Sequence, residues 1–216
     1  MSFTNIETEN PASSIYDRFA DLYDLTFKFN GYGRSLERYL REARLSLSSG
    51  ARILDAGCGT GLLTLALLRV LDRPVRIAAV DLSGSSLLKA RRAVSEAKSP
   101  RKHRVDFTHA NVLELPFADE TFEFVVTSGV LEYVPLREGF SELARVLAPG
   151  GYMLHLPVKP GPISSLLEVL FRFKTHSPEE VAAHTDRHFR VIERYRFPPL
   201  DPIGWTKIAV LAQKSQ

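Results

Sequence analysis

The stretch Ile53 to Gly61, ILDAGCGTG, decides the fold. A short apolar run enters a turn with glycine at Gly57, Gly59 and Gly61, and the leucine-rich segment 62–71 leaves it. Glycine lets a backbone turn sharply and approach a ligand, because no Cβ stands in the way. A strand, a glycine turn and a helix in this order predict a ligand site at the start of the helix.

Downstream of this turn, apolar runs of strand length alternate with helical segments. The strand candidates are RILDA, VRIAAVDL, RVDFTHANV, FEFVVTSGV and GGYMLHLPV, and the helix candidates are 62–71, 85–96 and 137–146. This alternation predicts a parallel sheet with helices on both faces. Ser83 is expected to cap the second of these helices.

The last third of the chain breaks the alternation. PISSLLEVLFRF is typical of an amphipathic helix, and SPEE at 177–180 predicts a capping-box start for another helix. HFRVIERYRF and GWTKIAVLAQK then follow with no helix between them, which predicts an antiparallel pair. The expected fold is one α/β domain with a doubly wound, mostly parallel sheet and an antiparallel C-terminal strand pair.

Composition excludes several classes of protein. The chain has 216 residues, 44% of them hydrophobic and 25% charged, as is usual for a single globular domain. A net charge of +3 is too small for a dedicated nucleic-acid binder. The single cysteine suits a cytoplasmic location, and the six histidines lack metal-ligand spacing, so no metal site is predicted. Neither a secretory signal nor a membrane-spanning run is recognised.

Two carboxylates indicate the kind of cofactor. Asp81 follows the second strand twenty residues after Gly61, where a carboxylate can accept hydrogen bonds from the ribose of a nucleoside. The G-x-G-x-G spacing differs from the dinucleotide fingerprint, and no G-K-[ST] closes a P-loop. Asp55 would repel a pyrophosphate but suits a cationic ligand. An NAD(P)-dependent oxidoreductase is therefore disfavoured, whereas a noncatalytic cofactor-binding protein stays open.

With these motifs taken together, the chain resembles the class I S-adenosylmethionine-dependent methyltransferases, especially the ubiquinone and menaquinone biosynthesis group. The resemblance runs from about Tyr16 to Pro157 and rests on YDRFADLYD, ILDAGCGTG, AAVDLS, ANVLELPFADETFEFVVTSGVLEYV and ELARVLAPGGYML. It implies a seven-stranded sheet, S-adenosylmethionine as cofactor and transfer of a methyl group to a small-molecule acceptor.

The resemblance also implies a set of cofactor-binding positions. They are Tyr16, Asp55, Ala56, Gly57, Cys58, Gly59, Gly61, Asp81, Leu82, Asn111, Val112, Ser128 and Gly129. Asp81 would hold the ribose, Leu82 would pack on the adenine, and Asn111 with Val112 would meet the adenine edge. Because the family usually has aspartate at the position of Asn111, a weaker adenine contact is expected. Cys58 is expected to be a small packing residue without chemistry of its own.

Three residues are candidates for a general base: Glu132, Tyr23 and His155. A base is needed only where the nucleophile has a high pKa, since positioning the two reactants is the main task of the protein. Each candidate has a plainer interpretation. Tyr16 and Tyr23 share one helical face that forms either a lid or a core contact. Glu132 either faces the substrate or serves a surface helix, and His155 is either near the site or a core histidine.

The variable segments are expected to select the acceptor. The predicted division is a loose tail (1–12), a helical lid (13–47), a cofactor-binding core (50–157), a helical substrate cover (158–185) and the strand pair (188–214). The apolar segment 163–173 either packs in the core or covers an apolar, lipid-like acceptor. With the basic charge, it is compatible with transient contact with a membrane surface. A quinone ring carbon and a phospholipid amine are both candidate acceptors.

Overall fold

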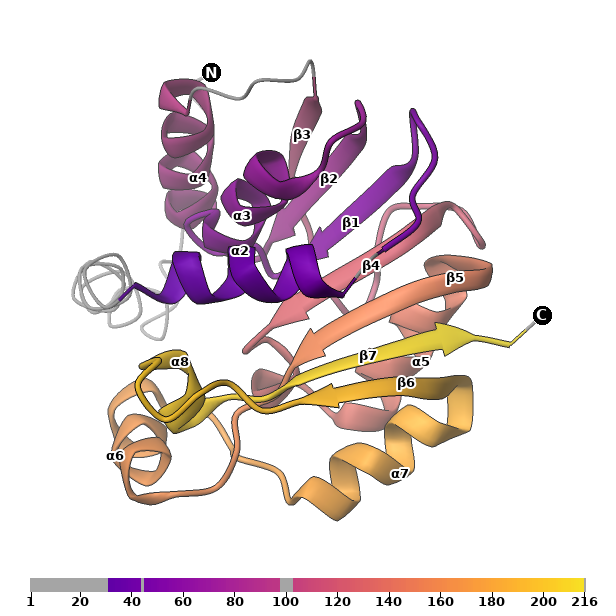
Figure 1. The fold of residues 1–216 in the computed structure, drawn as a ribbon. Helices are drawn as coiled ribbons and strands as arrows, with labels where there is room; N and C mark the ends of the chain where they lie inside the picture. The colour runs from indigo at the N-terminus through magenta and orange to yellow at the C-terminus, as the bar shows by residue number, and fades with distance from the viewer. Residues whose placement is uncertain (1–30, 44, 98–102, 216) are drawn as a thin grey trace, which may run out of the picture.

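The computed structural model describes residues 31–43, 45–97 and 103–215. A seven-stranded sheet has the order β3-β2-β1-β4-β5-β7-β6 (Figure 1). The strands are β1 (Arg52–Ala56), β2 (Arg76–Asp81), β3 (Arg104–His109), β4 (Phe122–Ser128), β5 (Leu147–Leu156), β6 (Phe189–Tyr195) and β7 (Ala209–Lys214). Strands β1 to β5 pair in parallel, and β7 is antiparallel to both β5 and β6. The predicted sheet and its antiparallel end are confirmed.

Helices cover both faces of this sheet. One face carries α2 (Tyr32–Glu42), α3 (Leu62–Val70) and α4 (Gly84–Glu96), and the other carries α5 (Leu136–Val146) and α7 (Pro178–His188). The 3-10 turn η1 (Leu131–Tyr133) follows β4. Two further helices, α6 (Pro162–Phe171) and α8 (Ile203–Thr206), lie beyond the arrowheads of β4 and β5 (Figure 1).

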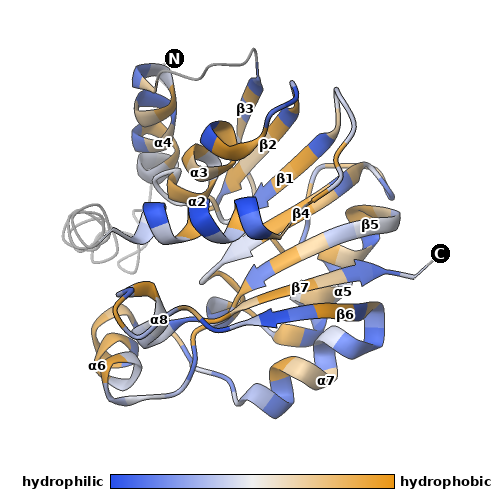
Figure 2. Cartoon of the chain, in the orientation of Figure 1, coloured by the Kyte–Doolittle hydropathy of each residue, from blue (hydrophilic) through white to orange (hydrophobic). Residues whose placement is uncertain are grey.

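The core consists of two layers separated by the sheet. Successive residues of a strand point to opposite faces, so Ile53 packs toward α2 and α3 while Leu54 packs toward α5. Figure 2 shows hydrophobic residues along the central strands and over α3. The strands are apolar nearly throughout because both faces are buried, as expected for a parallel sheet. The layers hold the carboxyl ends of the strands at one edge, where ligands of such sheets bind.

The helix starts agree with the predicted caps, with one difference. Ser83 Oγ accepts a hydrogen bond from Ser86 N at 3.2 Å and begins α4. Ser177 Oγ accepts from Glu180 N at 3.1 Å and begins α7. The Glu180 carboxylate pairs with His176 Nδ1 at 3.0 Å, so the capping box is formed only by its serine half.

The N-terminal segment, predicted as a lid over 13–47, is described from Gly31 onward. Its described helix, α2, packs in the core through buried residues that include Tyr32, Leu36 and Tyr39. Gly31, with a φ of 73°, caps the start of α2. Tyr16 and Tyr23 lie outside the described ranges, so the lid stays a prediction. The C-terminal strands also differ slightly, because the four-residue helix α8 stands in the connection between them.

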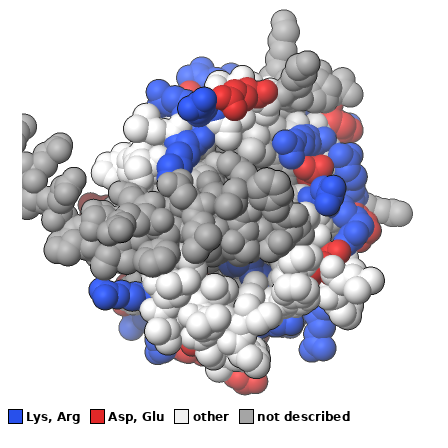
Figure 3. All heavy atoms as spheres, turned by 90° about the vertical axis from the view of Figure 1, so that its left-hand side faces the viewer, with Lys and Arg blue, Asp and Glu red and all other residues white. Residues whose placement is uncertain are grey.

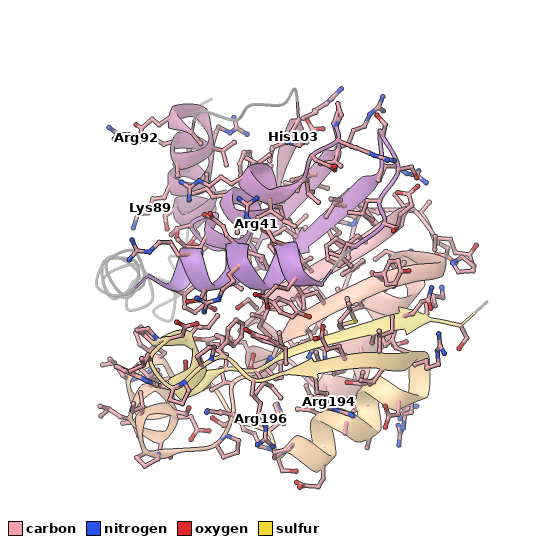
Figure 4. All side chains as sticks on the ribbon, viewed as in Figure 1. Arg41, Lys89, Arg92, His103, Arg194 and Arg196 are labelled. Atoms are coloured by element: carbon pink, nitrogen blue, oxygen red, sulfur yellow. The ribbon has the colours of Figure 1, made fainter. Side chains whose placement is uncertain are left out.

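Arginine side chains lie on several surfaces of the described chain. Arg190, Arg194 and Arg196 are exposed, but they do not share one face of the edge strand as predicted. A register shift between Val191 and Glu193 turns Arg190 and Arg194 to opposite faces, and Arg196 lies beyond the end of β6. Figure 4 shows Arg194 and Arg196 on the β6 side of the molecule, whereas Arg41 belongs to α2 and lies apart from them. Among the described helices, none combines the length and the apolar character that crossing a membrane requires.

Candidate functional site

The glycine turn lies where β1 ends beside β2. Gly57 N and Cys58 N donate to Val80 O at 2.9 and 2.8 Å, which ties the turn to β2. Gly57 has a φ of 72°, and a Cβ on it would lie 2.5 Å from Cγ2 of Val130, so only glycine fits. No described atom lies within 4 Å of a Cβ position at Gly59. The turn is therefore packed on one side and open to a ligand at Gly59.

Asp81 fastens this turn to the loop after β2. Its Oδ2 accepts from Gly59 N at 2.7 Å, and its Oδ1 accepts from Ser83 N at 2.8 Å. Burial raises the pKa of Asp81, and these two hydrogen bonds oppose the rise. A carboxylate oxygen has two lone pairs, so each oxygen can also accept from a ribose hydroxyl. The predicted role of Asp81 therefore fits its position.

Asp55 is a buried acid with one oxygen unsatisfied. The side chain of Thr64 donates to Oδ2 at 2.5 Å, while Oδ1 has no hydrogen-bond partner among the described residues. Burial raises the pKa of Asp55 to about 7, and the charge of Asp81 adds to this rise. A cation bound nearby would stabilise the ionised form. The acid thus fits the ammonium of S-adenosylmethionine, as the sequence predicts.

The predicted adenine side combines an exposed leucine with a tight turn. Leu82 is 67% exposed directly after Asp81, and its carbonyl oxygen lies 2.6 Å from Nε2 of His109. Because the apolar side chain of Leu82 is exposed at this position, the adenine ring of a cofactor could pack against it. Asn111 Oδ1 already accepts from Leu113 N at 3.0 Å, so its oxygen belongs to the turn. The contact of Asn111 and its buried neighbour Val112 with adenine stays a prediction.

Cys58 behaves as a packing residue in the structure. It is 6% exposed and belongs to a small cluster with Ala79, Leu87 and Ala90. Burial raises the pKa of its thiol, so the sulfur is protonated and unreactive. Its backbone, like that of the buried Ala56, shapes the turn.

A second group of polar residues lies where β4 ends. Tyr32 OH and Ser128 Oγ are 3.2 Å apart, and Gly129 follows with a φ of 75°. Glu132 is 6% exposed; its Oε1 accepts from Val158 N at 2.6 Å. Its Oε2 is buried and has no hydrogen-bond partner among the described residues. The predicted residues Ser128, Gly129 and Glu132 are thus brought together, with one carboxylate oxygen unsatisfied.

Lys207 joins this second group and was missed by the sequence reasoning. Its side chain is 2% exposed, and Nζ donates to Leu156 O at 3.3 Å. A Cβ on Gly129 would lie 3.0 Å from this Nζ. Burial lowers the pKa of Lys207, and the charge of Glu132 opposes this. The signal in the sequence is a lysine at the start of the apolar run KIAVLA, a pattern that by itself predicts only a strand.

His155 lies in the core between β5 and the helices α5 and α7. Its ring centroid is 5.4 Å from that of Phe140, and Nε2 lies 3.4 Å from Thr185 Oγ1. Burial lowers the pKa of His155 to about 3, so the imidazole is neutral at physiological pH. The structure does not bring it to the glycine turn, which agrees with the core interpretation of this histidine.

The glycine turn and the β4 group are adjacent, since Gly57 packs on Val130 between them. Acidic groups at β1 and β2 suit a cationic nucleoside, and the buried groups at β4 suit a second reactant. A cofactor at the glycine turn would therefore face an acceptor at the end of β4.

Comparisons with known proteins agree with this site. A family profile described as a methyltransferase domain matches residues 53–151. The chain is 33% identical over 153 residues to a demethylmenaquinone methyltransferase of Symbiobacterium thermophilum, covering 69% of this chain and 60% of that protein. It is 27% identical over 186 residues to a 2-phytyl-1,4-naphtoquinone methyltransferase of Thermosynechococcus vestitus, covering 85% of this chain and 79% of that protein. The match thus spans less than two thirds of the first relative.

The fold is also found in solved structures. A putative methyltransferase of Haloferax volcanii, solved in complex with the Trm112 activator, superposes with a TM-score of 0.71 at 18% sequence identity, covering 93% of this chain and 98% of that chain. This likeness shows the shared fold. The glycine turn with Asp55 and Asp81, the antiparallel end of the sheet and the related sequences all favour a methyltransferase over the dinucleotide-binding alternative. Together these findings support a class I S-adenosylmethionine-dependent methyltransferase that is similar to the ubiquinone and menaquinone biosynthesis methyltransferases.

Proposed function

We propose that the protein transfers a methyl group from S-adenosylmethionine to a ring carbon of a reduced quinone with an apolar tail. The observation that carries the cofactor half is the Asp81 carboxylate, which joins β2 to the open glycine turn through Gly59 N at 2.7 Å. The acceptor half is supported by the relatives, whose names refer to demethylmenaquinone and to 2-phytyl-1,4-naphtoquinone.

The chemistry of the acceptor favours its reduced form. S-adenosylmethionine supplies a methyl group on a positively charged sulfur, which is an electrophile. An oxidised quinone ring is poor in electrons, whereas the ring of a quinol donates electrons, most strongly when a hydroxyl is ionised. The ring carbon forms a bond to the methyl group, and the electron pair of the sulfur–methyl bond stays on the sulfur. The ring carbon then releases its proton, so no oxidant or reductant is consumed.

The residues of this chain would act mainly by positioning. Asp55 and Asp81 would orient the donor at the ends of β1 and β2, and the walls of the β4 group would exclude water from the acceptor. The unsatisfied Oε2 of Glu132 is available to accept a proton from the quinol. Tyr23 stays a candidate base outside the described residues, and the buried His155 has no part in the proposed chemistry.

An apolar tail would be accommodated by helix α6. Ile163, Leu166, Val169 and Leu170 are exposed there, with fractions from 37% to 82%. In Figure 3 the surface below the grey atoms, over this part of the molecule, is largely uncharged. Such a surface supports transient contact with a bilayer in which a lipid-like acceptor is dissolved. A cytoplasmic location and the selection of a quinol rather than a phospholipid amine stay predictions.

A turnover assay tests the proposal. The full chain is incubated with S-adenosylmethionine and a short-chain naphthoquinol kept reduced by dithionite, and S-adenosylhomocysteine is measured by mass spectrometry. We expect product with the quinol and none with the oxidised quinone, and a methylated ring in the acceptor. Asp81→Ala is the inactive control, and vesicles of phosphatidylethanolamine test the amine alternative. Cofactor binding without turnover on any acceptor would favour a noncatalytic binding protein.

A further inference from the structure

Lys207 is a buried lysine without a carboxylate partner among the described residues. It is 2% exposed, and none of the ion pairs among the described residues includes it. The one hydrogen bond of its Nζ in the described chain goes to Leu156 O at a long 3.3 Å. An ammonium has three N–H donors, and a buried charge is costly unless it is paired. The position of Lys207 therefore favours a ligand that supplies the missing hydrogen-bond acceptor.

The space beside Lys207 limits the size of that ligand group. A cavity of about 30 Å³ adjoins Lys207 and is lined among others by Gly129, Tyr133, Leu167 and Phe173. This volume holds roughly one or two water-sized groups, and no ring. A ligand would place a single oxygen there, while its apolar body would lie against Tyr133 and Phe173, whose ring centroids are 5.8 Å apart.

The charge at this position indicates the kind of oxygen. An ammonium attracts an anion and repels a protonated amine. Glu132 is near enough for its charge to act on Lys207, but the two form no ion pair: Oε1 accepts from Val158 N at 2.6 Å, and Oε2 has no hydrogen-bond partner among the described residues. The lysine lies over the ends of β4 and β5, because Ser128 and Leu156 are partners in the sheet register. This is the acceptor side of the site, next to the residues proposed to meet the substrate.

We propose that Lys207 binds an anionic oxygen of the methyl acceptor and so selects enol and phenol acceptors over amines. The inference deepens the proposed function and rests on it. An ionised hydroxyl held by Lys207 increases the electron density of the ring that is to be methylated. The carboxylate of the cofactor's amino-acid part also carries an anionic oxygen. The test must therefore distinguish an oxygen of the methyl acceptor from an oxygen of the cofactor.

The test compares two ligands that differ in one negative charge and one methyl group. In the presence of S-adenosylhomocysteine, calorimetric titration measures the Kd of 2-hydroxy-1,4-naphthoquinone, which is ionised at neutral pH, and of its uncharged 2-methoxy analogue. We expect the full-length wild type to prefer the ionised ligand by roughly 10- to 100-fold, as for a hydrogen bond between charged groups. Lys207→Met should reduce this preference to near one. Lys214→Met is the matched control: its Nζ donates to Ala144 O and Leu147 O at the other end of β7, and it should keep the preference.

A second titration separates the acceptor from the cofactor. Lys207→Met should bind S-adenosylhomocysteine within about threefold of wild type, which also shows that the variant is folded. A large loss of affinity for S-adenosylhomocysteine, with unchanged affinity for 5′-methylthioadenosine, would assign Lys207 to the cofactor carboxylate and overturn the proposal. Equal affinity of the wild type for the two naphthoquinones would overturn it as well, without reference to any variant. If the wild type bound no S-adenosylhomocysteine, the proposed function itself would fail.

Discussion

Asp55→Asn should change how the stability of the ligand-free protein depends on pH. The pKa of Asp55 is raised by burial from 3.8 to about 7. The folded protein therefore holds a proton that the unfolded chain releases between these values. The contribution of Asp55 to stability is fully present below about pH 4 and is lost as the pH rises to about 7. Asparagine has no such titration, so the variant should gain on the wild type across this range.

The size of the effect follows from the pKa difference. About three pKa units, at roughly 1.4 kcal/mol each, correspond to about 4 kcal/mol in total. Between pH 5 and pH 8 about 3 kcal/mol of this remains to be lost. The new amide has a constant cost, since it places an N–H group where Oδ1 has no described partner, and an unsatisfied buried donor costs about 1–3 kcal/mol. This cost is the same at both pH values and cancels in the comparison.

The assay is urea unfolding of wild type and Asp55→Asn at pH 5 and pH 8 without ligand. The difference in the free energy of unfolding between the two proteins should shift by about 3 kcal/mol in favour of the variant at the higher pH. Glu123→Gln is the control, because that side chain is 43% exposed and its surface ion pair is worth little. A difference between wild type and Asp55→Asn that stayed constant from pH 5 to pH 8 would refute the reasoning.

Three further predictions concern the cofactor side. The Kd of S-adenosylhomocysteine should rise by up to about tenfold per pH unit as the pH falls below 7, because the ammonium of this ligand prefers ionised Asp55. Calorimetric titration should show no such pH dependence in Asp55→Asn. Gly57→Ala should lower the free energy of unfolding by about 2–4 kcal/mol in urea, because of its positive φ and the contact with Val130, and Val130→Ala should restore part of it. Leu82→Ala should leave the Tm unchanged, because the side chain is 67% exposed, yet weaken S-adenosylhomocysteine about three- to tenfold.

The sequence predicts the fold well where structure depends on local periodicity. Strands and helices of the parallel core are recognisable because each strand is apolar throughout and each helix is preceded by a turn or cap. The boundaries are less accurate. β3 ends at His109, earlier than RVDFTHANV suggests, because Asn111 forms a turn with Leu113. α8 was not predicted, since four residues are too few to show a helical period.

The sequence likewise predicts the cofactor side of the site better than the acceptor side. The cofactor side depends on one short motif and on a carboxylate at a fixed distance from it, so the sequence is sufficient to locate Asp55 and Asp81. The acceptor side is assembled from distant segments. Lys207 lies near Glu132 because a bridge pairs it with Val158, whose N–H donates to the Glu132 carboxylate. No spacing in the sequence encodes that proximity, so it becomes visible only in the folded chain.

The two sides of the site carry opposite charges, and on the proposed function this has a consequence for turnover. Asp55 and Asp81 favour a cation at the ends of β1 and β2, and Lys207 favours an anion at the ends of β4 and β5. A sulfonium donor and an ionised quinol would be drawn to opposite sides and so face one another, as in-line transfer requires. The transfer removes the sulfonium charge, and the ring first becomes a neutral ketone that regains its hydroxyl when the ring carbon loses its proton. Because the acidic side attracts a sulfonium charge that the reaction consumes, the same electrostatics that gathers the substrates weakens the hold on S-adenosylhomocysteine.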